Sequence, residues 1–122
     1  MSERTAAGGL DLEALRRAAE GKDADAMLGL YADDAEYVRV DRNNTPSSPM
    51  ALHGKEDVSE YLRDVFSRDM THRIENEVVG EDRASFNWAC EYPDGTKVLA
   101  AETVELRDGM IVRQVSVQAW DE

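Results

Sequence analysis

The sequence is poor in the residues that build disulfides, metal centres and phosphate sites. Its only cysteine, Cys90, forms no intrachain disulfide and gives no sign of an oxidising compartment. Its two histidines, His53 and His72, lack the paired Cys or His spacing of a recognisable metal site. No glycine-rich phosphate loop and no Gly-x-Ser-x-Gly motif occurs. We therefore predict no metal and no cofactor.

Basic residues and long apolar runs are also scarce. Lys and Arg number 14 against 26 Asp and Glu, which gives a net charge of −12. Nucleic-acid binding requires clustered basic residues, and the longest basic run here is Arg16-Arg17. No apolar stretch approaches the roughly 20 residues that cross a bilayer, and no signal-peptide core is present. We predict no nucleic-acid or membrane partner and a cytoplasmic location.

The composition that remains suffices for one globular domain. Hydrophobic residues make up 42% of the 122 residues and charged ones 33%. Domains commonly contain about 100–150 residues. The small, polar residues 1–9 predict a flexible N-terminus. Residues 10–122 are predicted to form a single domain.

Helix and strand patterns follow one another along the first half of that domain. Asp11 is a candidate N-cap for a helix that ends near Gly21, and a second short helix begins near Asp23 with Tyr31 on its apolar face. Residues 35–41 alternate with period two and predict a strand, which residues 42–49 follow as a loop. A third helix begins after Gly54. Its apolar stripe is Val58, Tyr61, Leu62, Val65 and Phe66.

The second half alternates between strands and tight turns. Asp94-Gly95 and Asp108-Gly109 separate apolar runs and favour hairpins. Four strands are predicted, at 71–79, 84–92, 96–106 and 110–120, which would form an antiparallel meander. Helices that come early and a sheet that comes late predict an α+β fold in which the helices cover one sheet face.

This order of elements, with four local phrases, resembles the nuclear transport factor 2-like superfamily, which includes ketosteroid isomerases and SnoaL-like polyketide cyclases. The phrases are Leu30–Ala35, Leu52–Val58, Arg107–Val112 and Gln118–Trp120. The resemblance implies a cone-shaped α+β fold with three N-terminal helices packed on the concave face of a curved mixed or antiparallel sheet. It also implies a small-molecule pocket between these layers and a homodimer through the convex sheet face.

The ketosteroid isomerase pattern is only partly present. Its catalytic Asp position matches Arg39, with Asp41 two residues further along the same strand. Its oxyanion Asp position matches Glu102, its oxyanion Tyr matches Leu15, and its wall Trp matches Trp120. Because the base and the Tyr are replaced, the resemblance does not predict steroid isomerisation by the usual mechanism.

Three residues are candidates for catalysis. Glu102 interrupts an otherwise apolar strand row, and burial would raise its pKa, whereas it would be solvated if the other row faced inward. His72 could shuttle protons, with a buried, hydrogen-bonded core histidine as the alternative. Asp41 ends its strand and is a candidate base.

Substrate-binding candidates follow from which row of each strand faces the pocket. The family's register turns the row of Asn87 inward and places the aromatic row of Trp88 on the convex face; the reverse arrangement remains open. Arg39 would lie at the pocket rim if the polar row of its strand faces inward, and Tyr61 is a core aromatic or a ligand contact. The last strand offers Ser116, Gln118 and Trp120.

Two functions fit these predictions. One is a cofactor-independent isomerase, cyclase or dehydratase that transfers protons on a small cyclic or polyketide-like carbonyl compound, with positioned acid and base groups in a dry cavity. The other is a non-catalytic module that binds an apolar ligand or acts as a dimeric interaction partner. Epoxide hydrolysis is a weaker third option.

Overall fold

The computed structural model describes residues 9–121. The predicted flexible segment 1–9 therefore lies, except for Gly9, outside the described residues. Within them the elements are α2 (Leu12–Glu20), α3 (Ala24–Leu28), β1 (Tyr31–Val40), β2 (Met50–His53), α4 (Lys55–Ser67), β3 (Thr71–Val79), β4 (Arg83–Glu91), β5 (Lys97–Arg107) and β6 (Met110–Trp120).

The two N-terminal helices begin where the sequence predicts, at the N-cap Asp11 and next to Asp23. The Asp11 side chain accepts a hydrogen bond from the Ala14 backbone N–H at 3.1 Å, and Asp23 caps α3 in the same way. The prediction that Tyr31 belongs to the second helix is wrong. The backbone turns at Gly29, and Tyr31 opens β1, four residues earlier than the period-two pattern indicates.

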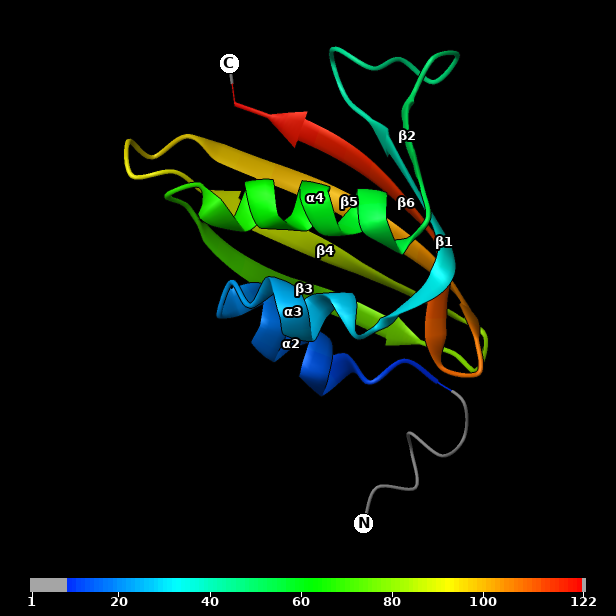
Figure 1. The fold of residues 1–122 in the computed structure, drawn as a ribbon. Coiled ribbons are helices and arrows are strands. Elements are labelled where there is room, and N and C mark those ends of the chain that lie inside the picture. Colours follow the sequence, from blue (N-terminus) through cyan, green and yellow to red (C-terminus); the bar gives the residue numbers. More distant parts are fainter. Residues whose placement is uncertain (1–8, 122) are drawn as a thin grey trace.

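The strands form one six-stranded mixed sheet in the order β2-β1-β6-β5-β4-β3 (Figure 1). The predicted meander of β3 to β6 is confirmed, since each strand pairs antiparallel with the next. β1 pairs with β6 in parallel, although β2, α4 and β3 to β5 lie between them in the sequence. The short edge strand β2 was not predicted, because four residues beside a loop carry no clear alternation.

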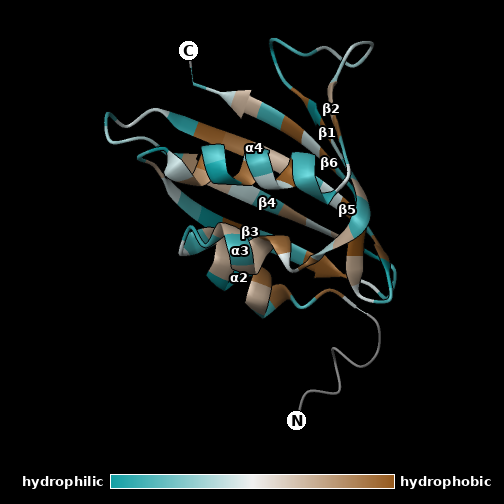
Figure 2. Ribbon diagram, viewed as in Figure 1, coloured by the Kyte–Doolittle hydropathy of each residue, from teal (hydrophilic) through white to brown (hydrophobic). Residues whose placement is uncertain are grey.

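All three helices lie on one side of the sheet, and the core fills the space between them and this inner face (Figure 1). Hydrophobic and hydrophilic residues alternate along the strands (Figure 2). β5 alternates strictly: Ala100, Glu102 and Val104 are buried, whereas Leu99 on the outer face is 51% exposed. The third helix follows β1 and β2, so the helices are not all N-terminal to the sheet.

The row assignment for β4 predicted from the family's register is wrong. Phe86 and Trp88 are buried against the helices, and Asn87 lies in the outer row, where its side chain accepts a hydrogen bond from Asn76. Large aromatic side chains remove more apolar area from water when they face the covered side of the sheet. Among residues 9–121, no helix has the length and apolar character needed to cross a membrane.

Candidate active site

A narrow cavity of about 60 Å³ lies between α4 and the inner face of the sheet. Most of its wall is apolar, which favours a ligand with an apolar body. Its polar or charged wall residues come from β1, α4 and its C-terminal end, the residue after β4, and the two central strands β5 and β6. They are Tyr31, Tyr37, Tyr61, Arg68, Tyr92, Glu102, Gln114 and Gln118, with Trp120 at the end of β6.

Glu102 is the only carboxylate in this wall, and it is 3% exposed. Burial raises its pKa to about 7, because a charged carboxylate loses its hydration in an apolar setting. Two hydrogen bonds oppose the shift: Gln114 Nε2 donates to Oε1 at 2.8 Å, and Ser116 Oγ donates to Oε2 at 2.9 Å. Glu102 can therefore accept and release a proton near neutral pH.

Gln114 is itself held in place by Tyr31. The Tyr31 hydroxyl donates to Gln114 Oε1, so the amide carbonyl faces Tyr31 and the amide N–H faces Glu102. Both Tyr31 and Gln114 are about 1% exposed. Burial first, and the nearby Glu102 charge second, raise the pKa of Tyr31 far above its ordinary value, so its phenol stays protonated. This chain fixes the orientation of the group that supports the Glu102 carboxylate.

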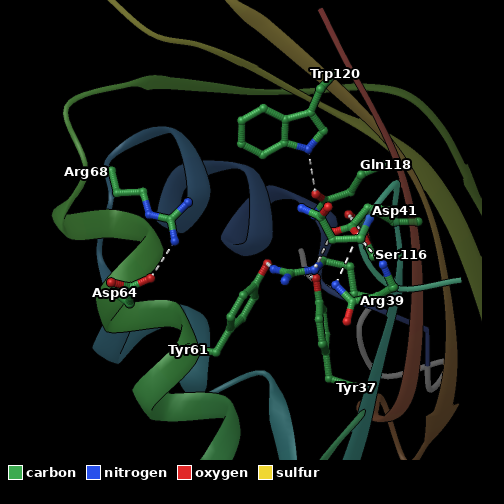
Figure 3. A network of polar contacts seen from close by, with 12 residues as sticks. Tyr37, Arg39, Asp41, Tyr61, Asp64, Arg68, Ser116, Gln118 and Trp120 are labelled. Carbon is green, nitrogen blue, oxygen red and sulfur yellow. Dashed lines mark hydrogen bonds and ion pairs between the residues drawn. The ribbon is translucent and has the colours of Figure 1, made fainter. Parts of the chain in front are cut away.

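A second polar chain approaches the cavity from β1 and α4 (Figure 3). Tyr37 Oη and Arg39 Nη1 each lie 3.2 Å from Tyr61 Oη and donate to it. The Arg39 guanidinium also lies over the Tyr61 ring, 5.4 Å from its centroid. Because the Tyr61 oxygen accepts both bonds, its own proton is free to point at a ligand. The polar row of β1 thus faces inward.

The predicted base Asp41 lies outside the cavity wall. Its carboxylate Oδ1 accepts hydrogen bonds from the backbone of Asn43 and Asn44, both at 2.9 Å, and from the Asn44 side chain. Its other oxygen lies 3.0 Å from Arg39 Nε, an ion pair without hydrogen-bond geometry. Burial raises the pKa of Asp41, but these hydrogen bonds and the Arg39 charge outweigh it and lower the pKa overall. In the structure this carboxylate stabilises a turn.

His72 is a buried core side chain beside the cavity, the alternative that the sequence left open. Trp88 Nε1 donates to its Nδ1 at 3.0 Å, and the Cys90 sulfur lies 3.4 Å from the same nitrogen. Burial, together with the charge of Lys22, lowers the pKa of His72 to about 4. The imidazole is therefore neutral near pH 7 and does not reach the cavity wall.

The predicted binding residues divide into three groups. Tyr61, Gln118 and Trp120 line the cavity. Ser116 and Arg39 do not line the cavity. Ser116 donates a hydrogen bond to the wall residue Glu102, and Arg39 donates one to the wall residue Tyr61. Asn87 lies on the outer face and cannot contact a ligand in this cavity, because the side chains of successive strand residues point to opposite faces.

Sequence reasoning missed Tyr31, Gln114 and Arg68 as wall residues. Gln114 precedes Ser116 by two positions and shares its strand row, so period-two alternation could have nominated it. No period-two alternation pointed to Tyr31, because it comes directly after residues with helical periodicity. Arg68 caps the C-terminus of α4 with extended backbone, a placement that only packing reveals. In the described part of the chain, no three His, Cys, Asp or Glu side chains gather as metal ligands would.

The sequence matches a known family. The family model of the SnoaL-like domain matches residues 12–114, which include β1, α4, Glu102 and Gln114. The chain belongs to the SnoaL-like domain family. No curated protein matches the sequence of this SnoaL-like domain. The family match and the shared fold confirm the predicted relation to the nuclear transport factor 2-like superfamily.

Solved structures share the fold of the SnoaL-like domain at low identity. A nuclear transport factor 2-like protein of unknown function from Mesorhizobium loti is 20% identical with a TM-score of 0.75, covering 97% of this chain and 93% of that one. A SnoaL-like protein of unknown function from Burkholderia thailandensis is 23% identical with a TM-score of 0.66, covering 90% of each chain. A protein from Kribbella flavida whose description proposes a ketosteroid isomerase is 16% identical with a TM-score of 0.73, covering 98% and 79%. At these identities the likeness shows the fold alone.

Proposed function

We propose that this SnoaL-like domain is a cofactor-independent acid–base enzyme that isomerises, cyclises or dehydrates a small cyclic carbonyl compound. The observation that carries the proposal is Glu102, a buried carboxyl with a pKa of about 7 in the wall of an apolar cavity. A general base works best when its pKa lies close to the working pH. Two solved structures with this fold, from Kribbella flavida and Rhodopseudomonas palustris, carry descriptions that propose an isomerase, which agrees with proton-transfer chemistry.

The proposed reaction begins with proton removal from a carbon next to the substrate carbonyl. The Glu102 carboxylate accepts this proton, the electron pair of the C–H bond forms a C=C bond, and the π pair of the carbonyl moves onto its oxygen to give an enolate. The free Tyr61 hydroxyl donates a hydrogen bond to the carbonyl oxygen, where the negative charge collects. Glu102 then returns the proton to another carbon or to a leaving hydroxyl.

Deuterium exchange tests this step without knowledge of the product. Small cyclic ketones, such as cyclohexanone and cyclohexenone, are incubated with the protein in D2O, and loss of their α-proton signals is followed by NMR. We expect exchange with wild-type protein and a loss of about 10²- to 10⁴-fold in Glu102→Gln. The glutamine keeps the volume and the Gln114 contact, so circular dichroism should match wild type. Exchange unchanged in Glu102→Gln would refute the proposal.

Binding without chemistry is the alternative function. It is favoured by the apolar character of the cavity, whose wall includes Trp88, Val98 and Ala100. The two functions differ in their pH dependence. An acid–base enzyme has an activity profile that follows the Glu102 titration, whereas affinity for an uncharged apolar ligand varies little with pH.

The cytoplasmic location stays a prediction from the sequence.

We also propose a homodimer through the outer sheet face. The helices leave this face uncovered, and it carries the exposed side chains of Leu99 (51%) and Val117 (50%). Exposed apolar side chains on one sheet face are typical of an interaction surface. Native mass spectrometry should find a dimer that Leu99→Lys combined with Val117→Lys converts to monomer. A wild-type monomer would refute this assembly.

A further inference from the structure

The free hydrogen-bonding groups of the cavity wall near its opening are donors. Trp120 Nε1 donates to Gln118 Oε1 at 3.1 Å, and because an indole N–H only donates, this bond turns the Gln118 carbonyl toward Trp120. The Gln118 amide N–H groups then find no protein acceptor among residues 9–121. Tyr61 likewise keeps a free O–H, since its oxygen accepts from two neighbours. A ligand must supply acceptor oxygens to satisfy these groups.

Positive charge also gathers at the opening. Arg68 lines the cavity, and its side chain is 40% exposed, which places it at the mouth, whereas the nearly inaccessible Glu102 lies at the base. Asp64 engages Arg68 Nη2 at 2.7 Å, and Tyr92 lies 3.5 Å from Nη1. A guanidinium carries five N–H donors, so several remain for a ligand.

Two features make this positive charge informative. The guanidinium of Arg42 lies over the Trp120 ring, 5.9 Å from its centroid, and adds a second cation next to a residue of the cavity wall. The whole chain has a net charge of −12. On net charge alone, this protein would attract cations. The basic side chains at the cavity opening would instead attract an anion.

We propose that the cavity selects an organic anion, a small cyclic or aromatic carboxylate whose oxygens bind the Arg68 guanidinium at the mouth and whose apolar ring enters the cavity. This inference rests on the proposed function only in taking the cavity as the substrate site. Carboxylate and guanidinium groups match in geometry, and such charged hydrogen bonds are stronger than neutral ones. Gln118 and Tyr61 donate to further acceptor oxygens on the ring.

Three probes of equal shape separate charge from ring. Benzoate, benzamide and the benzamidinium ion share one ring and carry charges of −1, 0 and +1, and each is titrated by calorimetry at pH 7.5. We expect benzoate to bind about tenfold more tightly than benzamide, and benzamidinium to bind most weakly. Because net charge alone would favour benzamidinium, the expected order is opposite to a nonspecific one. Benzamidinium binding as tightly as benzoate, or no binding of benzoate, would overturn the proposal.

Two variants of the same ion pair give effects of opposite sign. Arg68→Gln should reduce benzoate affinity about tenfold, to that of benzamide, and leave benzamide binding unchanged. Asp64→Asn frees Arg68 from its competing carboxylate, so it should tighten benzoate binding. Both residues are exposed on α4 or at its end, and both variants are expected to fold. Equal benzoate affinity in wild type and Arg68→Gln would show that the carboxylate binds elsewhere.

Glu102→Gln distinguishes this inference from the catalytic proposal. The variant should still bind benzoate with preference over benzamidinium, because Arg68 and Gln118 are intact. If that preference holds while deuterium exchange in wild type does not depend on Glu102, the anion site stands and the catalytic role fails. If exchange depends on Glu102 while benzamidinium is preferred, the catalytic role stands and the anion site fails.

Discussion

Two carboxylates, Glu102 in the centre of the sheet and Asp41 at the end of β1, are built from the same interactions with opposite results. Each loses hydration through burial and accepts hydrogen bonds from neighbouring side chains. For Glu102 burial outweighs two hydrogen bonds, and its pKa rises to about 7. For Asp41 the bonds from Asn43 and Asn44 and the Arg39 charge outweigh burial, and its pKa falls.

The difference shows that the depth of burial and the neighbouring charges, not the residue type, determine whether a carboxyl exchanges a proton or stays ionised. Among residues 9–121 no cation touches Glu102, whose hydrogen-bond partners are the neutral groups of Gln114 and Ser116. Asp41 has backbone N–H donors and a guanidinium beside it, which stabilise its charged form. Glu102 can exchange a proton near pH 7, while Asp41 stays ionised and stabilises the turn that follows β1.

Exchanging each acid for its amide tests this comparison at its largest expected effect. Glu102→Gln should lower deuterium exchange by about 10²- to 10⁴-fold, because it removes the proton acceptor. Asp41→Asn should change exchange little, since the carboxylate does not line the cavity. NMR exchange rates at pH 8 measure both. A larger loss in Asp41→Asn than in Glu102→Gln would reverse the assignment.

Stability against pH isolates the burial of Glu102. The folded state keeps a proton on Glu102 that the unfolded chain releases between about pH 4.5 and 7, so stability falls as pH rises through this window. At about 1.4 kcal/mol per pKa unit, the loss is about 3 kcal/mol. Urea unfolding of wild type and Glu102→Gln at pH 5 and 8 should show this difference in wild type only. A wild-type change matched in the variant would assign it to other groups.

The hydrogen bonds around Glu102 can be weakened singly. Ser116→Ala removes the donor to Oε2, so the pKa of Glu102 should rise, by about one unit. The midpoint of the exchange activity against pH should move upward by the same amount. Thr103→Ala, on the exposed outer face of β5, is the matched control and should leave the midpoint in place. A downward shift in Ser116→Ala would contradict the burial argument.

The smallest effect is expected at the Asp41 turn. Asp41→Ala removes the acceptor for the Asn43 and Asn44 N–H groups and should cost about 1 kcal/mol of stability, because the exposed part of the turn regains hydrogen bonds to water. Since the Asp41 pKa is lowered in the fold, this contribution is present above the unfolded pKa and is lost as pH falls through the folded pKa. Urea unfolding at pH 7 and pH 3 measures it. Equal losses at both pH values would show that charge plays no part.

Glu102 and Asn87 show how far strand patterns predict a site. On β5 the acid inside an apolar row predicted a buried carboxyl, with a solvated one as the alternative if the row of Leu99 faced inward, and the structure buries the row of Glu102. On β4 both rows were plausible, and the family's register favoured the wrong one. The structure decided for Phe86 and Trp88, which the helices cover. The roles of Glu102, Gln118, Trp120 and Tyr61 toward a ligand stay predictions.

The sequence by itself determined the local features of this SnoaL-like domain. The caps at Asp11 and Asp23 and the turns at Gly95 and Gly109 depend on side-chain and backbone chemistry within a few residues, which a sequence displays directly. Only the tertiary structure decided the composition of the site. The parallel pairing of β1 with β6 brings Tyr31 to Gln114 across 83 positions, and Tyr37 and Tyr61 meet across 24. Such contacts depend on which faces the helices cover and on strand register, and no local pattern encodes either.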